Sequence, residues 1–181
     1  MNNKQKILIF VVISLQILLL LSMIIKKEMS IRQGVKIIVR TVAVDPRDLF
    51  RGDYINLNYE FSRIDLNKIE HDKANFHKGQ KVFVRLSKTG EDWQAVQVSL
   101  NPIKNICPNE VLIKGSIEQY PSTDSINVVY GIESYFVPEG EGKYIEKKIF
   151  EKMVSVELSI DKQGDASVCK IFIDKEEVMF R

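Results

Sequence analysis

The sequence MVSVELSI at residues 153–160 alternates between apolar and polar side chains. Its apolar face carries Val154, Val156, Leu158 and Ile160. Its polar face carries Ser155, Glu157 and Ser159. This period of two residues is typical of an antiparallel strand with one face in a core and the other toward solvent. Such a strand near the carboxyl end predicts that the body of the chain is a β structure.

A second stretch, DYINLNYEF at residues 53–61, has the same period and supports the same prediction. Its apolar face carries Ile55, Leu57, Tyr59 and Phe61. Further strands are expected at residues 35–44, 81–87, 92–100, 111–118, 126–133 and 167–174. The segments 88–91 and 161–165 each contain a glycine and are expected to be hairpin turns, and one or two helical turns are expected over 64–71. The predicted fold is therefore mainly β, with a single antiparallel domain built as a curled sheet, barrel or sandwich.

The amino-terminal segment 7–25 contains no charged residue. As a helix it would span about 28 Å, close to the roughly 30 Å of a bilayer's hydrocarbon core. The sequence predicts a tail at 1–6, a transmembrane anchor at 7–25, a stalk at 26–34 and the β domain at 35–181. A cleaved signal peptide is the alternative, because Lys4 and Lys6 precede the apolar run. The run is longer than a usual signal peptide core and no small-residue cleavage site follows it, which favours an uncleaved signal anchor.

The charge distribution bears on partners and topology. The chain has 26 basic and 24 acidic residues, and the excess of two lies in Lys4 and Lys6. A body without a basic excess argues against a nucleic-acid partner. Lysines just after the apolar segment would place the body on the cytoplasmic side of the membrane by the positive-inside rule. The very short tail favours the opposite arrangement, which we adopt: the amino terminus inside and the body outside the cytoplasm.

The stretch DPRDLFRGDYINLNY at residues 45–59 is the most distinctive in the chain. Proline fixes its own φ and glycine can adopt positive φ, so this stretch is expected to form a shaped loop that leads into a strand. Leu57 and Tyr59 belong to the apolar face and are expected in the core. One interpretation makes the loop a scaffold that positions the strand. The other makes it half of a recognition surface, formed by Arg47, Arg51, Asp53 and Tyr54.

A second distinctive block, YGIESYFVPEGEG at residues 130–142, is rich in glycine and aromatic residues. It is expected to be a long structured loop rather than a strand. Its candidate contributions to the recognition surface are Glu133, Tyr135 and Glu139. Opposite charges and aromatic rings predict that the two blocks meet in space. The alternative is that the second block only packs its loop onto the sheet.

These two blocks resemble the GDYXXLXY family of bacterial membrane-anchored proteins. The fixed letters of that motif are present as Gly52, Asp53, Tyr54, Leu57 and Tyr59. The preceding DPRDLFR and the second block are also similar to the family's segments, and the resemblance extends over nearly the whole chain. It implies a single-pass protein of the bacterial cytoplasmic membrane and the cell envelope. It implies no established catalytic or binding residue.

Known catalytic and metal-binding patterns are not found. An anchored β domain with Gly-Asp after a proline is weakly similar to signal peptidases, but Ala43 and Val44 stand where those enzymes have Ser-Met, so the serine nucleophile is missing. His71 and His77 lie in a polar stretch, and a zinc site needs three or four converging donors. Cys107 and Cys169 are too far apart for a CxxC motif, and their pairing is left open. No catalytic residue, metal site or cofactor is therefore expected.

The sequence favours a non-enzymatic accessory or interaction subunit at the cell envelope. Its expected partners are the lipid bilayer, through residues 7–25, and another membrane protein. The alternative is a domain that binds a ligand or an envelope polymer. A hydrolase with an unrecognised site is the least favoured function.

Overall fold

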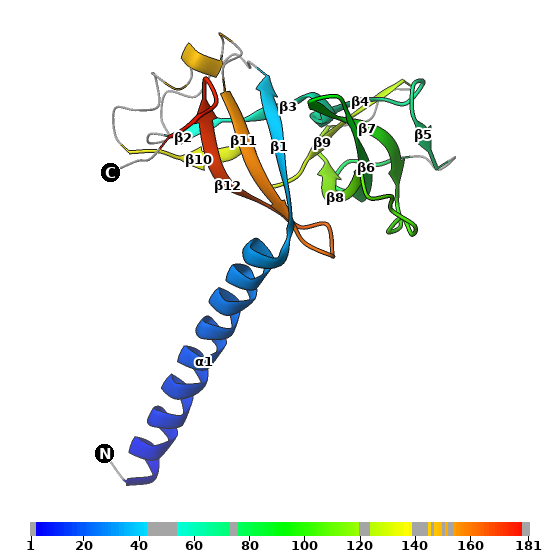
Figure 1. The fold of residues 1–181 in the computed structure, drawn as a ribbon. Coiled ribbons are helices and arrows are strands. Elements are labelled where there is room, and N and C mark those ends of the chain that lie inside the picture. The colour runs from blue at the N-terminus through cyan, green and yellow to red at the C-terminus, as the bar shows by residue number, and fades with distance from the viewer. Residues whose placement is uncertain are drawn as a thin grey trace.

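The computed structural model describes residues 3–42, 54–72, 76–119, 124–138, 145, 147–149, 151 and 154–178. Figure 1 shows one long helix that projects from a body made of two groups of strands lying side by side. The strands are antiparallel apart from one short parallel pair. The prediction of an amino-terminal apolar helix followed by a mainly antiparallel β domain is confirmed.

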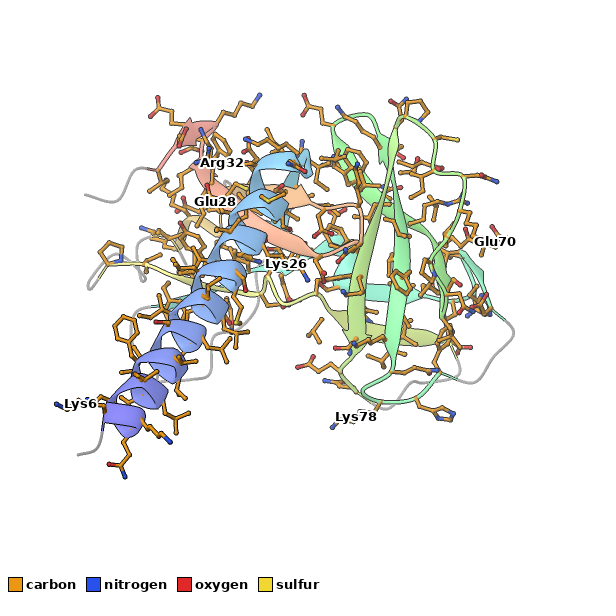
Figure 2. All side chains as sticks on the ribbon, turned by 90° about the horizontal axis from the view of Figure 1, so that it is seen from below. Lys6, Lys26, Glu28, Arg32, Glu70 and Lys78 are labelled. Atoms are coloured by element: carbon orange, nitrogen blue, oxygen red, sulfur yellow. The ribbon has the colours of Figure 1, made fainter. Side chains whose placement is uncertain are left out.

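Helix α1 (Asn3–Gln33) is longer than the predicted apolar segment and continues without a break through most of the expected stalk. All apolar side chains from 7 to 25 are exposed. Figure 2 shows Lys6 near the free end of α1 and Lys26, Glu28 and Arg32 near the end beside the body. In the described part of the chain, α1 is the one helix long and apolar enough to cross a membrane. Such an apolar surface is suited to lipid rather than to water.

The end of α1 is attached to the β body by several polar contacts. The Ser30 hydroxyl donates to the Asp161 carboxylate at 2.8 Å, and the Lys27 ammonium donates to the Ser167 hydroxyl at 2.7 Å. The Ser159 hydroxyl donates to the carbonyl of Ile31 at 2.8 Å, which satisfies one of the free carbonyls at the helix end. Because these contacts come from both strands of one hairpin, the helix is docked on the body rather than linked by a loose chain.

The first sheet has the order β13-β12-β11-β1-β3. Its strands are β1 (Val35–Val42), β3 (Asn58–Tyr59), β11 (Val154–Ile160), β12 (Ala166–Ile173) and β13 (Glu176–Glu177). The four apolar residues predicted to face inward from β11 are all buried. Ile37 and Val39 of β1 face the same core, so the alternation in the sequence sets which face of this sheet is covered.

The second sheet has the order β4-β9-β8-β6-β7-β5. Its strands are β4 (Arg63–Asp65), β5 (Glu70–His71), β6 (Lys81–Thr89), β7 (Asp92–Ser99), β8 (Glu110–Ile117) and β9 (Ser125–Val129). The β6–β7 turn contains Gly90 at φ 66°, a conformation that favours glycine. A separate two-stranded ribbon consists of β2 (Tyr54–Asn56) and β10 (Ser134–Phe136). One continuous hydrophobic core joins all three sheets.

Two local predictions are wrong. Residues 64–71 form β4, a turn and β5 instead of helical turns, with a short 3-10 helix η1 (Glu60–Ser62) just before them. Ile64 and Leu66 are buried on either side of Asp65, and this alternation has the two-residue period of a strand. The Asp65 carboxylate accepts a hydrogen bond from the backbone N–H of Asn67, which stabilises the turn after β4. In the second block, residues 134–136 form strand β10 rather than loop, because β2 provides a pairing partner that is distant in the sequence.

Candidate functional site

The two blocks singled out in the sequence meet at the β2–β10 ribbon. Ile55 lies opposite Tyr135, and Tyr54 lies opposite Phe136. The backbone N–H of Leu57 also donates to the carbonyl of Glu133 at 2.7 Å. The prediction that the blocks meet in space is therefore confirmed for their described residues.

Two buried tyrosines join the blocks more deeply. The Tyr59 hydroxyl donates to the carbonyl of Ile132 at 2.8 Å, and the Tyr130 hydroxyl donates to the carbonyl of Phe61 at 2.6 Å. The Phe61 ring stacks on Tyr59 at 5.2 Å and meets Tyr130 edge-on at 5.3 Å between ring centroids. The first block thus supplies a hydroxyl to a carbonyl of the second, and the second supplies one to a carbonyl just after the first, which fixes their relative position.

Burial determines the charge state of these two hydroxyls. It raises the pKa of Tyr59 and of Tyr130 well above the ordinary value, and the nearby Glu133 carboxylate raises both further. The two hydroxyls therefore stay protonated, and they serve as hydrogen-bond donors rather than as bases. In this site the tyrosines hold the structure together.

Glu133 stabilises the turn that precedes β10. Its carboxylate accepts the backbone N–H groups of Tyr130 and Gly131, the latter at 2.8 Å. Gly131 has φ 78°, so this turn requires the conformational freedom of glycine. Within the described parts of the chain, Glu133 forms no ion pair. Its observed contacts are therefore those of a residue that shapes the backbone of the second block.

The predicted recognition residues are only partly placed. Glu133 and Tyr135 are half-buried at the ribbon, and the backbone of Tyr54 begins β2. The other four lie outside the described residues: Arg47, Arg51, Asp53 and Glu139. The recognition surface as a whole stays a prediction.

Phe136 is a prominent surface residue that the candidate recognition set omits. Its side chain is 82% exposed, although it lies on β10 in the middle of the second block. The sequence contained a signal for it. Two consecutive aromatic residues on a strand must point to opposite faces, so either Tyr135 or Phe136 had to face solvent. A large exposed ring on a paired ribbon is a feature of interaction surfaces.

The histidines and cysteines are scattered. His71, His77 and Cys107 are exposed, and Cys169 is half-buried. Both cysteines are free thiols. Burial raises the pKa of the Cys169 thiol, with a further contribution from Glu157. Among the residues that the structure describes, no three His, Cys, Asp or Glu side chains form a group suited to a metal ion.

Comparison with known proteins supports the resemblance seen in the sequence. No curated protein and no solved structure matches this chain. The family model described as "GDYXXLXY protein" matches residues 16–171, which cover the second half of the apolar segment and nearly all of the β body. By this match the chain belongs to the GDYXXLXY family.

Proposed function

We propose that the protein is a non-enzymatic interaction subunit of the bacterial cell envelope, held in the cytoplasmic membrane by α1. The observation that supports this most strongly is the exposed Phe136 on a ribbon that two family-typical blocks build together. The buried and hydrogen-bonded Tyr59 and Tyr130 lie next to the ribbon, so the ribbon can present this ring on a firm base.

In this proposal α1 is an uncleaved signal anchor, and the β body lies outside the cytoplasm. The exposed apolar surface of α1 supports a place in the bilayer. Its polar contacts with the β11–β12 hairpin would hold the uncleaved anchor directly against the body. The body would then be held close to the membrane surface.

A photo-crosslinking amino acid at position 136 of the full-length protein tests the interaction surface in intact cells. We expect it to trap one defined membrane protein. Ile106 is also an exposed apolar residue but lies in the loop between β7 and β8, so the same probe at position 106 is the matched control. Equal crosslinking from both positions, or none from position 136, would refute the proposed surface.

A second candidate function is the binding of a ligand or an envelope polymer. It is supported by a groove of about 770 Å³ between β1, the β11–β12 face and the β6–β7 hairpin. A groove of this size is within the range of ligand sites. Binding of soluble envelope fragments to the purified protein, with protection of groove residues from chemical labelling, would favour this function over the first.

A further inference from the structure

The groove is built on the outer face of the first sheet, which is the face opposite the core. Arg40, Ser155 and Phe172 lie directly opposite one another on β1, β11 and β12. Because serine is short, its position between two long side chains leaves a hollow in the floor. Ile38, on the same face, is an apolar residue with 53% of its surface exposed. Polar residues are expected on a solvent-facing sheet surface, so the apolar Ile38 and Phe172 on this face are suited to contact with a partner.

The β6–β7 hairpin forms one wall of the groove. Lys88 and Trp93 are directly opposite partners in this hairpin, so their side chains leave the same face of it, and both line the groove. The hairpin is tied to the sheet by Arg40, whose guanidinium pairs with Glu91 at 3.0 Å and with Asp92 at 3.2 Å. This wall therefore holds the Lys88 ammonium and the Trp93 indole ring in a fixed position beside the sheet.

The β12–β13 turn forms the opposite wall. Its two central residues, Asp174 and Lys175, have φ of 53° and 71°. Turns of this geometry favour Asn-Gly, and other residues adopt it at an energetic cost. Asp174 and Lys175 adopt this unfavourable conformation where both of them line the groove. A lysine is consequently held at the rim across from the hairpin.

Both carboxylates that line the groove are already paired, Glu91 with Arg40 and Asp174 with Lys148. Lys36 is paired with Glu157 at 3.2 Å, and Arg40 is paired as described above. Lys88 and Lys175 form no ion pair with any residue that the structure describes. They lie on opposite walls, and the path between them crosses β12, β11 and β1. At about 4.8 Å per strand, that path is at least about 10 Å long.

We propose that this groove binds an extended acidic segment of another polypeptide. Two carboxylates of the segment meet Lys88 and Lys175, and the apolar side chains between them cover Ile38, Phe172 and Trp93. An extended chain advances about 3.3 Å per residue, so carboxylates about three or more residues apart match the two lysines. A small anion reaches only one of them. This site is separate from the Phe136 surface and does not depend on the function proposed above.

Trp93 provides the readout, because it is the only tryptophan in the chain. The probe is a peptide of about ten residues without aromatic residues, in which two glutamates flank about three valine or threonine residues. It is titrated into the full-length protein in detergent micelles while Trp93 fluorescence is recorded. We expect a saturable change that weakens as salt rises. The same peptide with glutamine in place of glutamate should bind at least about fivefold more weakly.

Variants assign the contact to the two walls. Lys88→Gln and Lys175→Gln should each weaken binding of the glutamate peptide by about three- to tenfold. Lys104→Gln, an exposed lysine outside the groove, should leave binding unchanged. Melting temperatures of all three variants should equal that of the wild type, which shows that a loss of binding is not a loss of folding.

Three results would overturn the proposal. The first is no Trp93 response at peptide concentrations up to about 1 mM. The second is equal affinity for the glutamate and glutamine peptides, or no effect of either groove variant. The third is a Trp93 response to polygalacturonate, a linear anionic polysaccharide, without a response to the peptide, which would assign the groove to an envelope polymer instead.

Discussion

At the scale of single residues, two buried hydroxyl groups add to the strand pairing that joins the two family blocks. Tyr59 and Tyr130 are both buried, and each donates to a carbonyl near the other block. A phenylalanine would fill the same space but would leave that carbonyl without its donor. Burial of an unsatisfied carbonyl costs more than the hydrogen bond itself contributes, which gives a physical reason for tyrosine at both positions.

Replacement of Tyr130 by phenylalanine tests this role. The change removes the donor to the carbonyl of Phe61 and keeps the ring. We expect the free energy of unfolding to fall by about 1–2 kcal/mol, measured by chemical denaturation of the full-length protein in detergent. Phe136→Ser is the control, because an exposed aromatic side chain should contribute less than about 0.5 kcal/mol. A larger loss from Phe136→Ser than from Tyr130→Phe would contradict these roles.

The same tyrosines predict sensitivity to alkaline pH. Their folded-state pKa values are raised above the ordinary value near 10. Below about pH 10 both the folded and unfolded chains keep the protons, so the contribution to stability is complete. At higher pH the unfolded chain releases them and the folded chain does not. Stability should therefore fall by about 1.4 kcal/mol per pH unit for each tyrosine.

Tyr59→Phe removes one of the two ionisable hydroxyls and so measures its share of the effect. The variant should start less stable, but its stability should decline less steeply above about pH 10 than that of the wild type. Denaturation curves at about pH 8, 9, 10 and 11 give the two slopes. Identical slopes would mean that the Tyr59 hydroxyl ionises as readily in the folded protein as in the unfolded one.

At the scale of elements, the junction between α1 and the first sheet determines how the body sits on its anchor. Gly34 connects the helix to β1, and a Cβ atom there would lie 2.2 Å from the Ser159 hydroxyl and 2.9 Å from the carbonyl oxygen of Ile160. No side chain fits in that space. The close approach lets the end of α1 pack against β11, where Ser159 can reach the helix carbonyls.

Gly34→Ala should therefore loosen the junction. We expect a loss of about 1–3 kcal/mol in stability, as for other insertions into packed regions, and faster proteolysis between α1 and β1. Gln33→Ala is the matched control, since its side chain is exposed on the preceding residue. Unchanged stability and protection in Gly34→Ala would show that the helix is only loosely attached.

At the scale of the whole molecule, the proposed topology places the entire β body outside the cytoplasm. Cys107 is exposed and can report on this without an added thiol, once Cys169 is replaced by serine. We expect a membrane-impermeant maleimide to label Cys107 in intact spheroplasts. Mass determination of the labelled protein should give the full-length chain, which an uncleaved anchor requires.

Labelling that occurs only after the membrane is permeabilised would place the body in the cytoplasm. Replacement of Cys107 by serine in the same background is the control and should abolish the label. A labelled product that begins near Lys26 would instead establish a cleaved signal peptide.

The sequence alone determined the apolar helix and the faces of the main strands. Periods of two residues and a long uncharged run are local patterns, and burial of an apolar face follows from them directly. The strand at 153–160 is the clearest example, since its four apolar residues are the ones that the core covers. The helical turns expected over 64–71 failed because pairing with β9, about sixty residues away, outweighed the local preference.

Other features depend on contacts between distant parts of the chain. Tyr59 and Ile132 are separated by 73 residues, and Ser30 and Asp161 by 131. Charge and aromatic content suggested that the two blocks would meet, but not that Glu133 would bind backbone N–H groups or that Phe136 would face solvent. The groove forms between the outer face of the first sheet and a hairpin of the second sheet. No local spacing encodes such a meeting, so only the tertiary structure could decide where these residues lie.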